Sequence, residues 1–118
     1  MHELGLLHSV VVAVEKAASA AGATKVDAVG LKVGSQSGAE PLALEGAWPV
    51  VTAGTIVDGA RLELELVQAA VWCQTCQAER DIDEYYAWTC PVCGTPCGAL
   101  ARGREFEVTY ADLADGQP

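Results

Sequence analysis

Two CxxC pairs constrain the fold of this chain more than any other feature. Cys73 and Cys76 form the first pair, Cys90 and Cys93 form the second, and thirteen residues separate them. A CxxC turn aims two thiolates at one point, and two such turns complete a tetrahedron of sulfur ligands around a metal ion. The pattern predicts a closed, structural zinc site in a segment of roughly thirty residues, which is too short to bury an adequate core unaided.

Other interpretations of the cysteines remain open. Iron fits the same tetrahedron of thiolates and is the chemical rival of zinc. Buried thiols without a metal leave the double spacing unexplained, and a redox site needs only one CxxC pair. The fifth cysteine, Cys97, is interpreted as a small, partly buried residue, with a substitute ligand or an oxidisable thiol as alternatives. Trp72 and Trp88 precede the two pairs closely and are expected to pack over the turns.

Hydrophobic periodicity outside the cysteine segment predicts a mixture of helices and strands. Apolar residues at three- and four-residue steps predict a helix over about 5–21, and a second helical segment runs from Pro41 to Gly54. Alternating apolar residues predict strands at 29–33, 60–67 and 104–113. The chain is therefore expected to be an α+β protein.

Pro49 is inconsistent with the second helix. A proline inside a helix removes a backbone hydrogen bond and clashes with the carbonyl four residues earlier, here that of Glu45, at a cost of ~3 kcal/mol. The sequence therefore predicts a kink or break near Trp48.

The order of these elements predicts an insertion. Helices and strands precede Val71 and return after Ala101, so residues 1–70 and 102–113 should form one α+β domain. Residues 71–101 should form an inserted metal domain, and 114–118 a flexible tail.

Charge and hydropathy argue against several classes. The formal net charge is −9 and the seven basic residues are scattered, so neither a nucleic acid nor an anionic membrane is an expected partner. The apolar N-terminus resembles a signal peptide, but Glu3, Glu15 and Lys16 interrupt it, and a cytoplasmic protein is expected. No nucleophile–base pair or paired carboxylates indicate an enzyme, and Glu63 and Glu65 are expected to face water.

The N-terminal sequence MHE offers a second metal site. If Met1 is retained, its amine, the His2 amide and His2 Nδ1 can converge on one ion, and the Glu3 amide or carboxylate can supply a fourth ligand. Nitrogen-rich tetragonal coordination is the preference of Ni(II) and Cu(II). The alternative is a histidine that lies at the terminus by chance, with no ligand role.

Several stretches together resemble the HypA/HybF family, metallochaperones that insert nickel during maturation of [NiFe]-hydrogenase. The resemblance lies in MHELGLLHSVV, VGLKVGSQSGAEPLAL, GTIVDGARLELELV, CQTC, CPVCG and GREFEVTYADL. These stretches cover the chain, in order, to about Leu113. The resemblance implies two helices packed on a small mixed β-sheet, with an inserted, zinc-ribbon-like four-cysteine domain.

The resemblance also implies roles for particular residues. His2, with the backbone from Met1 to Glu3, matches the family's nickel site, and the four cysteines of the CxxC pairs match its structural zinc ligands. Glu40 falls where the family carries an acidic residue. One interpretation is an auxiliary contact to nickel or to a partner; the other is an acid stabilised by the helix dipole at the start of a helix. His8 replaces a residue that is usually polar and uncharged, and it is expected to face solvent.

The implied function is delivery of nickel to the hydrogenase large subunit in cooperation with a GTPase accessory protein, and some relatives also serve urease. A monomer or weak dimer is expected. The alternatives are a zinc-ribbon interaction adaptor without a nickel role and, third, an iron–sulfur electron carrier.

Overall fold

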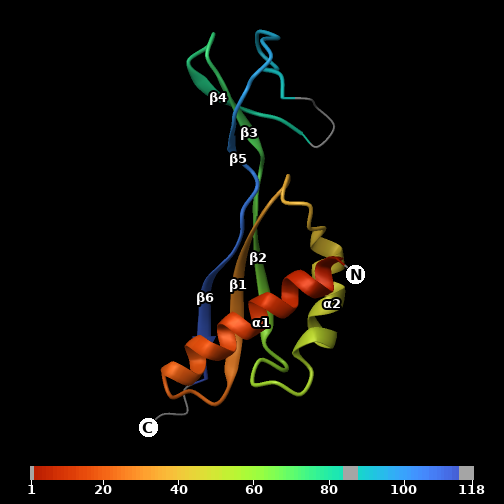
Figure 1. Cartoon of the computed structure of the whole chain (residues 1–118), viewed down its shortest axis with the longest axis vertical. Coiled ribbons are helices and arrows are strands. Elements are labelled where there is room, and N and C mark those ends of the chain that lie inside the picture. Colours follow the sequence, from red (N-terminus) through yellow and green to blue (C-terminus); the bar gives the residue numbers. More distant parts are fainter. Residues whose placement is uncertain (1, 84–87, 115–118) are drawn as a thin grey trace. The chain divides into compact units, whose positions relative to one another are not determined.

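The computed structural model describes residues 2–83 and 88–114 and divides the chain into two compact units (Figure 1). The first, here called the helical unit, contains the chain up to Lys32, residues Ala39–Glu65 and the segment from Glu107 onward. The second, the cysteine unit, contains Val33–Gly38 and Leu66–Phe106. In the described part of the chain, no helix has the length and apolar character needed to cross a membrane.

The first helix, α1, spans His2–Ala20 and therefore begins before the predicted start. One face of α1 is buried, and it carries Leu7, Val10, Val11, Val14 and Ala18. Gly22 follows the end of the helix, and its φ of 78° provides the left-handed conformation that such an end requires. The amide of Ala23 then bonds to the carbonyl of Ala18 at 2.9 Å, closing the last turn.

The second helix, α2, spans Pro41–Thr52 and packs against α1. Pro41 occupies its first turn, where a missing amide costs nothing. The predicted break near Trp48 is wrong, because the helix continues through Pro49. Pro49 and Glu45 are both exposed, so water can reach the backbone there, and the helix ends within a turn of the proline.

The mixed sheet has the order β2-β1-β6, with β1 at Val26–Gly34, β2 at Arg61–Val67 and β6 at Phe106–Leu113. Figure 1 shows α1 lying across these strands. The predicted α+β arrangement, two helices with small mixed sheets, is confirmed.

Backbone bonds at the ends of the strands give their directions. The amide of Ser35, directly after β1, donates to the carbonyl of Val67 at the end of β2 at 2.9 Å, so β1 and β2 run parallel. The amide of Gly34 donates at 2.8 Å to Glu105, directly before β6, so β6 runs opposite to β1. The parallel pair is joined through α2, as a parallel connection requires.

The core of the helical unit joins β1 to both helices. Leu31 and Val29 of β1 and Leu44 of α2 are fully buried. Trp48 is also buried, and its indole Nε1 donates to the carbonyl of Ala60 at 2.8 Å. This bond satisfies both polar groups away from water and ties α2 to the start of β2.

The other side of the sheet is exposed. Glu63 and Glu65 are solvent-exposed, as expected. Tyr110 lies over Gly30, where a Cβ would overlap the tyrosine ring, and its hydroxyl donates to the carboxylate of Glu63. Glycine at position 30 therefore lets the ring cross the central strand.

The cysteine unit contains an antiparallel sheet of order β4-β3-β5, with β3 at Ala70–Cys73, β4 at Ala78–Asp81 and β5 at Leu100–Arg102. Its buried cluster is small. The cluster consists of Ala69, Val71 and Ile82, with Trp88, Cys97 and Leu100 packed against it.

Two ion pairs and a cation–π contact link side chains within the cysteine unit. Arg102 of β5 forms ion pairs with Glu79, at 2.5 Å, and with Asp81, both on β4. The guanidinium of Arg104 lies 5.1 Å from the ring centroid of Trp88, within the range of a cation–π contact.

Two glycines allow backbone segments of the cysteine unit to approach closely. A Cβ on Gly34 would overlap the backbone of Gly103, and a Cβ on Gly103 would lie 2.6 Å from that of Ala69. Gly103 also has a φ of 127°, a conformation that other residues rarely adopt. The amide of Gln36 donates to the Gly103 carbonyl at 2.7 Å, so the close approach is used for a backbone hydrogen bond.

Candidate metal centres

The four predicted cysteines come together in the cysteine unit. Cys73 ends β3, Cys76 lies in the turn that leads to β4, and Cys90 and Cys93 lie in the loop that follows the undescribed residues 84–87. All four sulfur atoms lie within 4.8 Å of one another. Cys73 and Cys90 are buried, and Cys93 is exposed. In the described residues this is the one such group of potential metal ligands.

Each of the two CxxC turns is followed by a residue with a positive φ. The residue after each pair adopts a left-handed conformation, with φ of 55° at Gln77 and 79° at Gly94. Gly94 adopts it without strain, and its amide donates to the Cys90 carbonyl at 2.9 Å. At Gln77 the side-chain amide compensates by donating to the carbonyl of Gln74 at 2.7 Å. The left-handed residue after each CxxC pair reverses the direction of the chain there.

The sulfur spacing fits a tetrahedral metal ion. Cys73 Sγ lies 3.6 Å from Cys93 Sγ, and Cys76 Sγ lies 3.9 Å from Cys90 Sγ. A tetrahedral zinc site with bonds of ~2.3 Å has sulfur–sulfur edges of about 3.8 Å. The two observed distances bracket that value, and both join a cysteine of one CxxC pair to a cysteine of the other.

The four thiols have unequal acidities. Burial raises the pKa of Cys90, but the amides of Cys93 and Val92 donate to its sulfur and lower its pKa to about 6. Arg80 lowers the pKa of Cys76, whereas the neighbouring sulfurs and burial outweigh it and raise that pKa to about 11. One ionised sulfur in such a group disfavours ionisation of the next. A cation among the sulfurs removes this conflict.

Two threonines support the exposed cysteine. Thr95 Oγ1 lies 3.0 Å from Cys93 Sγ and 3.1 Å from Thr75 Oγ1, so the hydroxyls connect the two CxxC turns. The hydroxyl and amide of Thr95 lower the pKa of Cys93. The carbonyl of Thr95 also accepts a hydrogen bond from the Cys90 amide at 2.9 Å.

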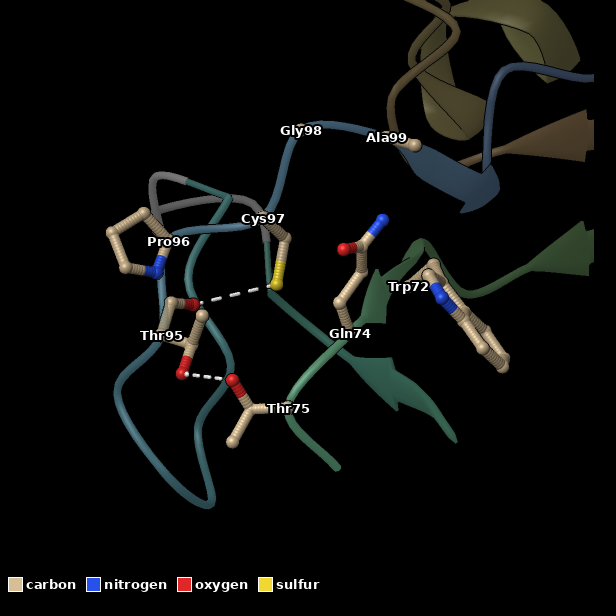
Figure 2. Close-up of a pocket in the computed structure, with 8 residues that line it drawn as sticks. All are labelled: Trp72, Gln74, Thr75, Thr95, Pro96, Cys97, Gly98 and Ala99. Carbon is tan, nitrogen blue, oxygen red and sulfur yellow. Dashed lines mark hydrogen bonds between the residues drawn. The ribbon is translucent and has the colours of Figure 1, made fainter. Parts of the chain in front are cut away.

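Cys97 lies outside the four-sulfur group and is half-buried, as expected. Its thiol donates to the Thr95 carbonyl at 3.4 Å. Cys97 lines a cavity of about 590 Å³ between two chain segments, and Figure 2 shows the residues that line it. Trp72 lines this cavity on the opposite segment, and Trp88 packs on the buried cluster. Trp88 therefore contributes to the apolar cluster of the cysteine unit, whereas Trp72 lines the cavity beside Cys97.

The N-terminal residues lie at the start of α1, in the helical unit. Met1 lies outside the described residues, whereas His2 and Glu3 belong to the first turn. The His2 side chain is 58% exposed, and its Nδ1 lies 4.0 Å from a carboxylate oxygen of Glu3. The first amides of a helix have no carbonyl partner within the helix. The His2 amide is therefore not engaged by the backbone of α1, whereas the Glu3 amide donates to its own carboxylate.

The Glu3 side chain has a contact that sequence reasoning missed. Its carboxylate accepts the amide of Glu40 at 3.2 Å, at the residue that precedes α2. The backbone amides of Glu3 itself and of Glu40 lower the pKa of this carboxyl. The contact joins the MHE and SGAEP stretches, 37 residues apart. The carboxylate of Glu40 is exposed and caps no amide of α2, and His8 is solvent-exposed, as expected.

Comparison with known proteins places these features in a family. A family model described as hydrogenase/urease nickel incorporation metallochaperone HypA matches residues 1–113. A hydrogenase maturation factor HypA from Roseiflexus sp. is 38% identical over 100% of this chain and 96% of its own length. Another, from Chloroflexus aurantiacus, is 36% identical over 92% of this chain and 95% of its own.

Two solved structures share the fold. The solution structure of the Ni metallochaperone HypA from Helicobacter pylori superposes with a TM-score of 0.57 at 17% identity, covering 90% of this chain and 95% of its own. A further HypA solution structure gives a TM-score of 0.68 at 18% identity, with 96% of both chains covered.

The fold and the sulfur group define a small α+β metal-binding protein built from two units. The match across nearly the whole chain is more specific than that class. The chain belongs to the HypA family, the metallochaperones for nickel incorporation into hydrogenase and urease. The family is one of maturation factors, and its role is to handle a metal ion for another protein.

Proposed function

We propose that this protein carries Ni(II) at its N-terminus for insertion into the [NiFe]-hydrogenase large subunit. The observation that carries the proposal is the position of His2, which is exposed in the first turn of α1 beside amides that have no carbonyl partner within the helix. Nickel is the cargo, so the site must bind it reversibly and at a place that a partner can reach. An exposed first turn meets both requirements.

The proposed donors are the Met1 amine, the His2 amide, His2 Nδ1 and the Glu3 amide. The carboxylate of Glu3 already accepts the amides of Glu3 and Glu40, so the Glu3 amide must give up its bond to the carboxylate to become the fourth ligand. Four nitrogen donors suit planar Ni(II) and disfavour zinc. Because the Met1 ammonium and the two amides must lose protons, binding weakens steeply as the pH falls, which provides a route to release. The exposed carboxylate of Glu40 is a candidate auxiliary contact.

We propose that Cys73, Cys76, Cys90 and Cys93 hold a structural zinc ion. Four thiolates fill the coordination sphere and leave no open position for chemistry. The zinc would hold residues 71–101 as a folded module. Cysteines that must stay reduced to bind a metal suit the cytoplasm, where disulfides are rare.

The proposed partners are a GTPase accessory protein and the hydrogenase large subunit, with urease accessory proteins as further candidates. Their support is the family's role in nickel incorporation into hydrogenase and urease. The protein is proposed to act without catalysing a reaction of its own.

Nickel titration of zinc-loaded protein with its native N-terminus tests the proposal. We expect about one Ni(II) per chain and the absorption spectrum of a planar, nitrogen-ligated ion. His2→Ala and a variant with one residue added before Met1 should both lose this binding. His8→Ala is the matched control, because it removes an exposed histidine from the same helix, and it should bind as the parent protein does.

Unchanged nickel affinity in both altered N-termini would refute the nickel site. That outcome would leave a zinc-containing interaction adaptor as the better description. Nickel transfer to the purified, nickel-free large subunit tests the client: the parent protein should supply the metal faster than His2→Ala does. Equal transfer rates would contradict this choice of client.

A further inference from the structure

Arg80 lies on the face of the small sheet that leads to the metal site. On β4 it is directly opposite Val71 of β3, and Cys73 is two residues further along the same strand. Side chains two residues apart on a strand share a face, so Arg80, Val71 and Cys73 lie on one side. Glu79 and Asp81, the carboxylates that pair with Arg102, alternate with Arg80 along β4 and occupy the opposite side.

One polar group of Arg80 is left without a partner. Its Nε is buried and makes no hydrogen bond within the described residues. A buried donor in this state costs roughly 1–3 kcal/mol. Arg102, on the other face, donates to two carboxylates and has no such deficit.

The groups that act most strongly on Arg80 are cysteine sulfurs. The Arg80 side chain interacts with the sulfurs of Cys76 and Cys90. These two cysteines belong to different CxxC turns, and their sulfurs lie 3.9 Å apart. A donor beside them can contact both halves of the metal site.

We propose that Arg80 is the outer cation of the four-cysteine centre, donating to the metal-bound sulfurs of Cys76 and Cys90 and slowing loss of the metal. The inference rests on the metal site proposed above. In this arrangement the buried Nε of Arg80 donates to a cysteine sulfur. A sulfur is a good acceptor when it is ionised, as it is when it binds a metal.

Charge makes this contact stronger than an ordinary hydrogen bond. Four thiolates and one divalent ion carry a net negative charge, and a guanidinium beside them offsets part of it. Residues that hold metal ligands from outside commonly change metal affinity 10–100-fold when they are removed. Arginine suits this place better than lysine, because its rigid fork can reach two sulfurs at once. Arg80 is thus a positioning residue that acts through the cysteines.

The test compares zinc loss and cobalt spectra in the full-length protein. Zinc-loaded Arg80→Met, Arg80→Lys and Arg102→Met are each mixed with a coloured chelator at one fixed pH, and the rate of transfer is followed. Arg102→Met is the matched control, because it removes the same charge from the same sheet on the face away from the sulfurs. The same variants are loaded with Co(II), whose sulfur-to-metal charge-transfer band reports hydrogen bonds to the sulfurs.

We expect Arg80→Met to release zinc about 10–100-fold faster than the parent protein, and its cobalt charge-transfer band to move to lower energy. Arg80→Lys should lie between the two. Arg102→Met should keep the parent's band. If Arg80→Met does not fold, Arg80→Lys provides the spectroscopic comparison, since it keeps a cation but removes Nε.

An unchanged cobalt band in the Arg80 variants would overturn the inference, even if zinc left faster, because losing a donor to the sulfurs must change their electronic state. Equal zinc release from Arg80→Met and Arg102→Met would also overturn it. A parent protein that bound neither zinc nor cobalt at the cysteines would instead refute the metal site itself.

Discussion

Removing the metal should unfold the cysteine unit and leave the helical unit folded. Among the described residues, the fully buried cluster of the cysteine unit is Ala69, Val71 and Ile82, with Trp88, Cys97 and Leu100 partly buried against it. Burying a valine or isoleucine side chain contributes about 1.5–3 kcal/mol, so the cluster supplies roughly 5 kcal/mol. Structural zinc contributes roughly 10–16 kcal/mol in small zinc domains. A structural zinc ion would therefore stabilise this unit more than its fully buried cluster does, whereas the helical unit has a core of its own.

Tryptophan fluorescence separates the two responses, because the three tryptophans are divided between the units. Trp48 is buried in the helical unit at 6% exposure, whereas Trp72 and Trp88 belong to the cysteine unit. A strong chelator added to the parent protein should move the emission to longer wavelength as Trp88 becomes hydrated. A variant with Trp72→Phe and Trp88→Phe, which keeps only Trp48, should show no shift.

Two results would refute the reasoning. A shift of the Trp48 emission on chelation would mean that both units unfold together. An unchanged spectrum in the parent protein, with loss of zinc verified by metal analysis, would mean that the small cluster suffices without the metal. Cys73→Ala should reproduce the effect of the chelator and retain part of the nickel binding at the N-terminus.

Three further predictions concern stability. Gly103→Ala should lower the free energy of unfolding, measured by urea titration, by about 2–4 kcal/mol, because the added Cβ would overlap Ala69 and the φ at this position is unfavourable for alanine. Gly98→Ala is the control, because a Cβ there meets open space, and it should change the free energy of unfolding little. Gln77→Gly should raise the melting temperature of the zinc-loaded protein, since it relieves a left-handed residue at a cost of about 1 kcal/mol. The pKa of Glu3 is lowered from its ordinary value of 4.5, so its carboxylate stabilises the folded state above that pH and stops doing so as the pH falls through the lowered pKa. Glu3→Gln should therefore be less stable than the parent protein at pH 7 and equally stable in strong acid, and a difference that persisted in acid would contradict the assigned contact.

Regular patterns in the sequence predicted the main elements and the sulfur group well. The three- and four-residue steps of α1 reflect which side chains are buried, whereas in β2 Leu62 and Leu64 are only half-buried and Leu66 is exposed. The two CxxC pairs predicted that four sulfurs meet, because each turn is a local structure that needs no knowledge of the rest of the chain. Such features depend on neighbours in sequence, which is why they could be found.

Features that depend on distant residues were missed. Nothing near Glu3 indicates that its carboxylate accepts the Glu40 amide, since that contact exists only once α1 and α2 pack together. Arg80 follows Cys76 by four residues, a spacing that could have drawn attention to it, but its place beside Cys90 depends on how the second CxxC turn folds back.

The expected break at Pro49 failed for a related reason. The local cost of an internal proline is real, but it was weighed without the packing that holds the helix. Trp48, one residue earlier, is anchored by its bond to Ala60, and the hydroxyl of Thr52 bonds to the Trp48 carbonyl at 2.9 Å. These contacts keep the last turn of α2 in place across the proline.

Two metals held by one chain at two chemically different sites are central to the proposed function. X-ray absorption at the nickel edge, on protein loaded with one equivalent each of zinc and nickel, tests this arrangement most directly. We expect a planar nickel ion surrounded by nitrogen, with sulfur scattering confined to the zinc edge. Sulfur scattering at the nickel edge would place nickel among the four cysteines and contradict the separation of the two sites.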